Sequence, residues 1–173
     1  MKKLESVNDG YELLKQLGAS PKLIRHVCLV GEAADLLLSK IEQIGIKVDV
    51  HFVRLGVALH DAGKIIYTEE LTNKGNKHEV EGESLLIKNG VEPSLARCCR
   101  SHAQWEIMEC SLEELLVALS DKLWKGKRED QLEEEVINRL SKLTGKDYWR
   151  LFIELDNHFE MIASSGEERL ARG

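Results

Sequence analysis

Apolar residues recur at three- and four-residue spacing along most of the chain, which is the period of helices that bury one face. Strand-like alternation and aromatic residues are few. Ser20 and Pro21 supply an N-cap and a proline for the first helical position, and Gly45 should stop the helix that follows. The apolar stripe of this helix consists of Leu23, Val27, Val30, Ala34, Leu37, Ile41 and Ile44. The pattern predicts an all-α fold.

The same periodicity, together with capping residues, glycines and prolines, places the other helices. They are expected over residues 11–17, 50–62, 78–89, 93–102, 112–125, 129–143 and 146–163. Residues 64–77 contain Asn, Gly and Thr and should be mostly loop, while the tail from residue 164 should be frayed. No internal repeat or linker interrupts the series, so residues 1–173 are predicted to form a single domain.

Composition and charge narrow the class of protein. A chain of 173 residues can bury a core, and 43% hydrophobic with 31% charged residues is typical of a soluble globular protein. The net charge of −6 gives no footprint for general nucleic-acid binding, which uses basic patches. No segment approaches the roughly 18 apolar residues of a membrane span. We therefore expect neither a membrane nor nucleic acid in general as a partner.

The cysteines and the first residues point to a cellular compartment. Cys28, Cys98, Cys99 and Cys110 form no CxxC pair and are expected to be reduced, buried thiols. The start, MKKLESVNDG, lacks the apolar stretch of a secretory signal. Both features predict a cytoplasmic protein. Apolar helix faces such as the one in Leu151–Leu155 would allow a homodimer.

Metal-ligating residue types recur at the ends or faces of five expected helices. Any single histidine is weak evidence, and His51 and His158 are expected to be surface or structural residues. The ordered set is more informative, and it consists of His26, His60, Asp61, His78, His102 and Asp121. Imidazole and carboxylate are ligands that Mn, Fe, Co, Ni and Zn accept. The set therefore predicts a site for divalent transition metals between the helices.

The two oxygens of Asp61 would allow this residue to bridge two metals. The other ligands would then divide into His26, His60 and Asp121 for the first metal, and His78 and His102 for the second. Two metals about 3.5–4 Å apart suit phosphoryl transfer, because they lower the pKa of a water and hold the phosphate oxygens.

The ordered pattern H…HD…H…H…D, over about residues 24–128, resembles the HD-domain metal-dependent phosphohydrolases. The local segments ALHDAGK, HEVEGESLL and SDKLWKGKR are similar to the segments that carry the ligands in this family. The resemblance implies an HD-domain-like helical bundle with a metal site between helices, followed here by C-terminal helices over about 129–163. It also implies a small phosphorylated substrate, often a nucleotide, cleaved at a phosphomonoester, phosphodiester or phosphoanhydride bond.

The presence of both His78 and His102 resembles the subgroup with two metals. The layout is closest to bacterial members that cleave dinucleoside tetraphosphates, but the segments before His78 and around His102 differ from theirs. The motifs of the cyclic-dinucleotide branch do not occur. Two alternatives to a hydrolase stay open, namely a nucleotide-sensing module without useful turnover and a di-iron oxygenase of the HD type.

Three further residues complete the predicted site, namely Lys64, Arg128 and Trp105. Asp61 and Lys64 are the candidate catalytic residues. Asp61 would position the nucleophile, and Lys64, three residues further along the chain, would neutralise charge on the phosphate. Arg128 lies seven residues beyond Asp121, so it would return to the same helix face and bind phosphate. Trp105 could stack on a base. Lys122 should point elsewhere, about 100° around the helix from Asp121.

Overall fold

The computed structural model describes residues 2–173, and within these residues it contains helices and no strand, which confirms the all-α prediction. The elements are α1 (Val7–Gln16), α2 (Pro21–Gln43), α3 (Val50–Leu59), η1 (Ala62–Ile65), η2 (Thr68–Leu71), α4 (Lys77–Lys88), α5 (Pro93–Ala96), α6 (Cys98–Gln104), α7 (Leu112–Leu123), α8 (Asp130–Thr144), α9 (Tyr148–Ser164) and α10 (Gly166–Arg172). The two η elements are 3₁₀ helices.

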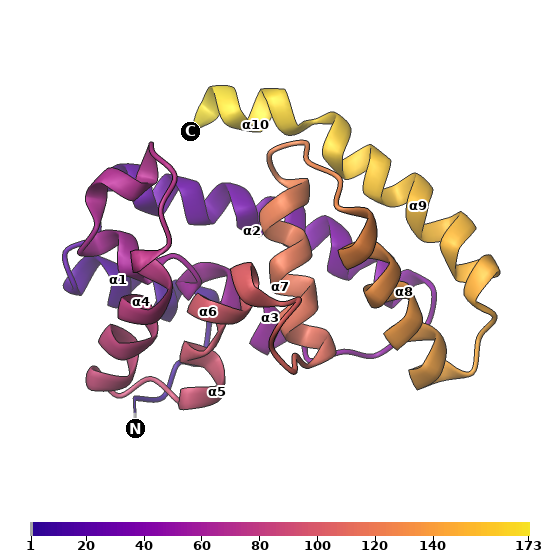
Figure 1. Ribbon diagram of the computed structural model, residues 1–173, viewed down its shortest axis with the longest axis horizontal. Coiled ribbons are helices and arrows are strands. Elements are labelled where there is room, and N and C mark those ends of the chain that lie inside the picture. The colour runs from indigo at the N-terminus through magenta and orange to yellow at the C-terminus, as the bar shows by residue number, and fades with distance from the viewer. Residues whose placement is uncertain (1) are drawn as a thin grey trace.

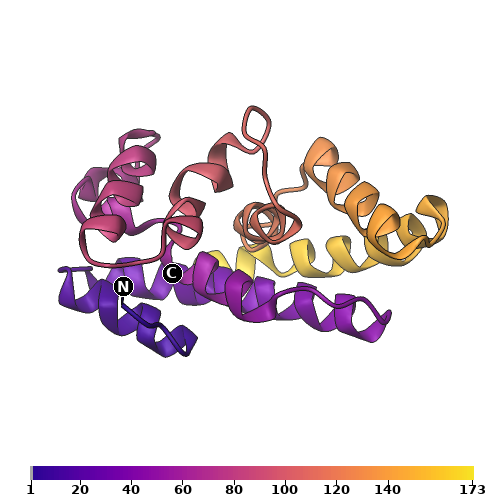
Figure 2. The same cartoon turned by 90° about the horizontal axis from the view of Figure 1, so that it is seen from below.

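The long helix α2 runs across the molecule and packs against α3, α7 and α9 (Figures 1 and 2). At one end of the molecule α1 and α4–α6 gather around α3, and at the other end α8 and α9 pack together. One apolar cluster joins α2, α7, α8 and α9, and a second joins α1, α3, α4 and α5. Helices α3 and α7 meet between these two parts of the core.

Helix starts follow the capping chemistry in the sequence. Ser20 accepts a hydrogen bond from the backbone N–H of Leu23 at 3.2 Å, at the start expected for α2. Helix α1 begins at Val7 and not at Tyr11, because Ser6 and Asp9 form a capping box that the apolar pattern did not indicate. The helix expected over residues 50–62 ends at Leu59, where η1 follows.

Two expectations about irregular segments are wrong. Residues 64–77 are more ordered than a loop, since they include the end of η1 and all of η2. The tail is also folded: α10 packs back on the domain, and the buried Arg169 donates to the backbone carbonyls of Trp124 (3.2 Å) and Ile162 (2.8 Å). The contact with Trp124 joins residues far apart in the sequence, so local periodicity could not reveal it.

Two glycines bring η1 and α4 into contact. A Cβ atom on Gly63 would lie 1.9 Å from the backbone oxygen of His78, and one on Gly82 would lie 2.8 Å from the backbone nitrogen of Gly63. Any larger residue would push η1 away from α4. Since Asp61 immediately precedes η1 and His78 lies in the first turn of α4, this packing sets the distance between the two side chains.

Three other expectations need correction. The short helix expected over residues 93–102 is two helices, α5 and α6. All four cysteines are free, but Cys28 is half-buried and not buried like the other three. In Leu151–Leu155 both terminal leucines are in the core, and the apolar surface of α9 is formed instead by Ile153 with Trp149. Within residues 2–173, no helix is both long and apolar enough to cross a membrane.

Candidate metal centre

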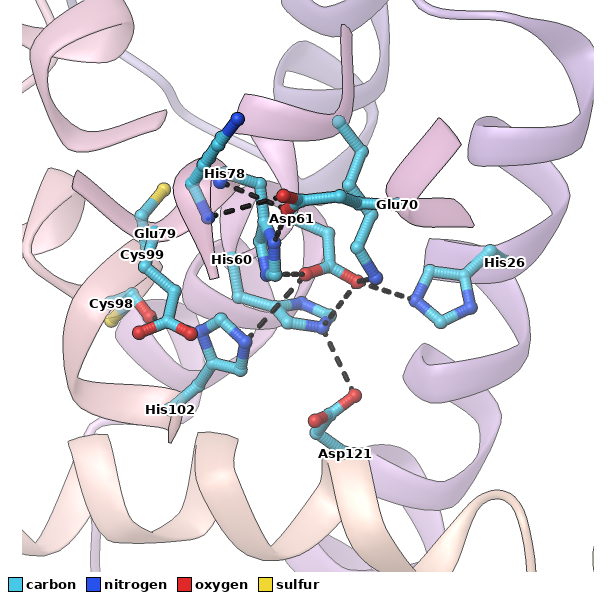
Figure 3. Close-up of polar contacts among 12 residues, drawn as sticks. His26, His60, Asp61, Glu70, His78, Glu79, Cys98, Cys99, His102 and Asp121 are labelled. Atoms are coloured by element: carbon cyan, nitrogen blue, oxygen red, sulfur yellow. Dashed lines mark hydrogen bonds and ion pairs between the residues drawn. The ribbon is translucent and has the colours of Figure 1, made fainter. Parts of the chain in front are cut away.

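Asp61 lies at the centre of the histidine cluster, where the chain leaves α3 and enters η1 (Figure 3). Its Oδ2 atom is 2.7 Å from Nε2 of His26 and 3.4 Å from Nε2 of His60. Its Oδ1 atom is 3.3 Å from Nε2 of His78 and 3.6 Å from Nε2 of His102. Each oxygen of one carboxylate therefore faces a different pair of imidazoles, which is the arrangement a bridging ligand needs.

Three of the histidines are oriented by acceptors on their other ring nitrogen. Nδ1 of His60 donates to the carbonyl of Val57 at 2.6 Å, and Nδ1 of His102 donates to the carbonyl of Cys98 at 2.9 Å. These carbonyls can only accept, so Nδ1 carries a proton in both rings. The Nε2 atoms are thus the nitrogens that point toward Asp61 and could ligate a metal.

The third oriented histidine uses a residue that sequence reasoning missed. Nδ1 of His78 lies 2.5 Å from the carboxylate of Glu70, which also accepts from the backbone N–H groups of Lys77 and His78. Gly75 makes room for it, because a Cβ there would lie 2.3 Å from Glu70 Oε1. Glu70 is buried although it is charged. A carboxylate in the segment taken for loop was the only signal, and the sequence contains many such residues.

The structure brings together all six predicted ligands. Nε2 of His60 is also 3.3 Å from Oδ1 of Asp121 on α7. The donor atoms form two groups in which all lie within 4.8 Å of one another: His26, His60, Asp61 and Asp121 in one, and Asp61, His78 and His102 in the other. The grouping agrees with the division expected from the sequence.

These residues fit a divalent metal. Oδ1 of Asp61 is buried and has no hydrogen-bond partner in the described part of the chain. A buried carboxylate oxygen without a partner is costly, and a cation held between it and the two facing Nε2 atoms would offset that cost. The nitrogen and oxygen donors suit the first-row transition metals.

The charges of the cluster favour a cation. Burial lowers the pKa of His60, but the carboxylates of Asp61 and Asp121 outweigh burial and raise this pKa to about 10. Burial raises the pKa of Asp61, yet His60 and the hydrogen bond from His26 hold it well below its usual range. Burial and the neighbouring charge of His60 lower the pKa of His102 to about 4. The site therefore keeps its carboxylates ionised and His102 neutral, and a bound cation would displace the proton that these carboxylates hold on His60.

A cleft of about 420 Å³ opens onto the cluster. Its lining includes five of the six candidate ligands, Glu70 and Glu79, and the four lysines Lys64, Lys74, Lys122 and Lys125. Nζ of Lys64 donates to Oδ2 of Asp61 at 2.9 Å. The expectation that Lys122 points away from the site is wrong. The cleft is wide enough for Lys122 to line it next to Asp121.

The structure does not bring Arg128 or Trp105 to this cleft. Arg128 was expected on the helix face of Asp121, but α7 ends at Leu123 and the chain turns at Gly126, whose φ is +80°. Its guanidinium instead binds carboxylates on α8 and α9. Trp105 packs against the apolar core and lines a different cavity. His51 and His158 also lie apart from the cluster, where each contacts a backbone carbonyl.

Comparison with known proteins agrees with this geometry. The family model described as HD domain matches residues 11–126, and the chain therefore belongs to the HD domain family. The members of this family are typically metal-dependent phosphohydrolases that bind divalent metals. The match includes all six candidate ligands and ends before α8.

Two relatives can be compared over most of the chain. An uncharacterised protein of Methanocaldococcus jannaschii is 30% identical over 151 residues, which cover 79% of this chain and 85% of the relative. A protein of Thermoplasma volcanium named tRNA (cytidine(56)-2′-O)-methyltransferase is 27% identical over 146 residues, which cover 76% of this chain but 40% of the relative. The chain thus corresponds to less than half of that methyltransferase. No solved structure matches the chain with significance.

Proposed function

We propose that this protein is a hydrolase that cleaves a phosphomonoester, phosphodiester or phosphoanhydride bond in a small phosphorylated substrate, a nucleotide being the leading class. The observation that carries the proposal is the Asp61 carboxylate, whose two oxygens face two separate pairs of imidazoles. Such a carboxylate would hold two divalent ions side by side, with His26, His60 and Asp121 around one and His78 and His102 around the other. Two ions so placed would activate a water and offset the charge on the phosphate oxygens.

The residues of the chain would divide the remaining work. Asp61 would fix the two ions relative to each other and position the attacking water. Lys64, which is held on Asp61 and lines the cleft, would neutralise charge on the phosphate. Glu70 would keep the His78 ring in the orientation that ligation requires.

Support for a phosphorylated substrate comes from the four lysines of the cleft. They favour phosphate chemistry over the reaction of an HD-type oxygenase, because cations offset the charge of phosphate oxygens. A nucleotide is favoured by the family and by the name of one relative, which is a tRNA methyltransferase. The nucleotide-sensing module without turnover shares every one of these features, so turnover must be measured directly.

The experiment is a hydrolysis screen of nucleotides, sugar phosphates and dinucleoside polyphosphates with Mn²⁺, Fe²⁺, Co²⁺, Ni²⁺ or Zn²⁺. Wild type is compared with Asp61→Asn, and the exposed Asp130→Asn serves as the control. We expect wild type and the control to release phosphate from at least one substrate, and Asp61→Asn to lose a hundredfold or more, about the effect of losing a metal site. Tight binding without release in any metal would favour the sensing module, and full activity of Asp61→Asn would contradict the mechanism.

The finer points of location and assembly are part of the same proposal. Four free cysteines support a reducing compartment such as the cytoplasm. Helices α8 and α9 lie beyond the family match but share a core with α2 and α7, and α10 contacts α9, which supports a single domain over residues 1–173. Exposed Trp149 and Ile153 on α9 would allow a homodimer. Light scattering of wild type and Trp149→Ser would test that assembly.

A further inference from the structure

The cleft contains more positive charge than the metal ligands and their supports require. Of the four carboxylates in its lining, Asp61 and Asp121 belong to the two ligand groups, and Glu70 is held by His78. Glu79 accepts a hydrogen bond from Nε2 of Gln104 at 2.8 Å. Among these carboxylates, only Asp61 contacts a lysine of the cleft, namely Lys64.

Three of the lysines are free of such contacts. In the part of the chain that the structure describes, the ion pairs within 4.0 Å include none made by Lys74, Lys122 or Lys125. Lys74 lies in the segment between η2 and α4, and the other two lie at the end of α7. Cations from two separate segments thus line one cleft together with the metal ligands.

The backbone around Lys122, in the last turn of α7, and Lys125, in the turn that follows α7, is held by hydrogen bonds. The N–H of Lys127 donates to the carbonyl of Lys122 at 3.1 Å, and the N–H of Gly126 donates to the carbonyl of Leu123 at 3.0 Å. With Gly126 at φ +80°, these bonds form a Schellman turn that closes the helix. Arg169 of α10 holds the same turn through the carbonyl of Trp124. Lys122 and Lys125 therefore line the cleft from a hydrogen-bonded turn.

A helix C-terminus attracts cations, and this effect alone could explain lysines at the end of α7. Lys127 is the internal comparison, since it lies on the same turn but is exposed and faces Glu129 at 4.0 Å. Lys122 and Lys125 are half-buried and line the cleft instead. Burying part of a charged side chain is costly, so their placement calls for an anionic ligand.

We propose that Lys122, Lys125 and Lys74 form a second anion subsite, which binds a phosphate group of the substrate other than the one being cleaved. The substrate is then a small molecule with at least two phosphate groups, one over the metal ligands and Lys64 and one against these three lysines. This inference rests on the proposed function for the first phosphate, but the lysines that carry it are not metal ligands.

Charge balance supports two phosphate groups. With two divalent ions bound, the four carboxylates of the lining would be neutralised and the four lysines would remain. A phosphomonoester dianion would offset only half of that charge, whereas a second phosphate would offset the rest. The lining contains no tyrosine, tryptophan or phenylalanine on which a base could stack. Recognition would therefore depend on the spacing of phosphates more than on the base.

The test compares the binding of methylphosphonate with that of bisphosphonates whose phosphorus atoms are separated by one, two or three carbons. Titration calorimetry is carried out on manganese-loaded protein, with metal content measured before and after. We expect at least one bisphosphonate to bind wild type about tenfold or more tightly than methylphosphonate. Lys122→Gln/Lys125→Gln should lose most of this preference and keep its metal content and its affinity for methylphosphonate. Lys127→Gln, the matched control, should behave like wild type.

The outcomes separate the subsite from the hydrolase. If the double variant keeps the wild-type preference for bisphosphonates, the subsite is wrong, whether or not the protein hydrolyses phosphate esters. If the preference disappears in the double variant but wild type hydrolyses nothing in the screen, the subsite stands and the hydrolase proposal fails. A 5′-phosphorylated trinucleotide that binds through the same lysines more tightly than every bisphosphonate would overturn the assignment to a small molecule.

Discussion

The charged clusters around Asp61 and Arg128 are built in opposite ways. Around Asp61, imidazoles and a lysine converge on one carboxylate, and one buried oxygen of that carboxylate has no hydrogen-bond partner among residues 2–173. Around Arg128, one guanidinium meets three carboxylates at full hydrogen-bond distance: Glu133 at 2.6 Å, Asp156 at 2.6 Å and Glu160 at 2.7 Å. The cluster around Asp61 leaves atoms that can bind a ligand, whereas the charged groups around Arg128 are paired with one another.

The difference separates a binding site from a structural contact. A buried polar atom without a hydrogen-bond partner destabilises the fold unless a ligand contacts it. Such an atom in a folded protein therefore indicates a ligand. The Arg128 cluster joins the start of α8 to α9 and gains nothing from a ligand. The position of Arg128, seven residues beyond Asp121, suggested phosphate binding in the sequence, and only the positions of its partners show that it serves the fold.

The largest effect on metal affinity and hydrolysis is expected from substituting a candidate metal ligand that the fold does not need. His26 is the most exposed of the four histidines in the cluster, so His26→Gln should not affect folding. Removing its Nε2 from the first ligand group should lower metal affinity and hydrolysis by about a hundredfold. Isothermal titration with Mn²⁺ and the activity screen measure both. His51→Gln, at an exposed histidine outside the cluster, should match wild type, and equal affinity in both variants would remove His26 from the site.

A smaller effect is expected from the residue that orients a ligand. Glu70→Gln keeps the shape of the side chain but weakens its contact with Nδ1 of His78. Metal affinity of the second group should fall about 10–100-fold, while the first group is little changed. Two-site metal titration separates the groups. The neighbouring exposed Glu69→Gln is the control, and if the two variants bind metal alike, Glu70 is not a supporting residue.

Substitutions in the Arg128 cluster should lower the free energy of unfolding and leave metal and substrate binding unchanged. Arg128→Met leaves the buried carboxylate of Glu133 without its partner, which should cost about 1–3 kcal/mol of unfolding free energy. Urea denaturation measures this loss. Metal affinity and the KM for the best substrate should be unchanged, and a KM raised tenfold would restore Arg128 as a phosphate ligand.

The smallest effect on stability is expected for an isolated, partly exposed ion pair in the same part of the molecule. Arg139 contacts Glu135 one helical turn away on α8, and the two side chains are 36% and 41% accessible to solvent. Arg139→Ala should cost no more than about 0.5 kcal/mol. If its loss equals that of Arg128→Met in the same denaturation experiment, the Arg128 cluster has no special structural role.

The fold class and the six candidate ligands that the structure brings together could be predicted from the sequence, because both depend on local patterns. Helical periodicity and the caps at Ser20 and Ser111 are local, and the HD-type pattern attaches each ligand to a recognisable segment. Residues whose role depends on contacts between segments distant in the sequence were missed or misplaced. Glu70 and Lys122 reach the cleft through the packing of separate segments, and Arg128 leaves it because α7 ends early. The folded tail was missed for the same reason.

The most direct test of the metal centre is the metal content per chain, measured by elemental analysis of protein purified without chelator or histidine tag. Wild type, Asp61→Asn and the control Asp130→Asn are compared after reconstitution with Mn²⁺, Fe²⁺, Co²⁺, Ni²⁺ or Zn²⁺. Since Asp61 faces both ligand groups, the account predicts close to two ions in wild type and the control, and loss of both in Asp61→Asn. Two ions retained in Asp61→Asn, or none in wild type with any of these metals, would contradict it.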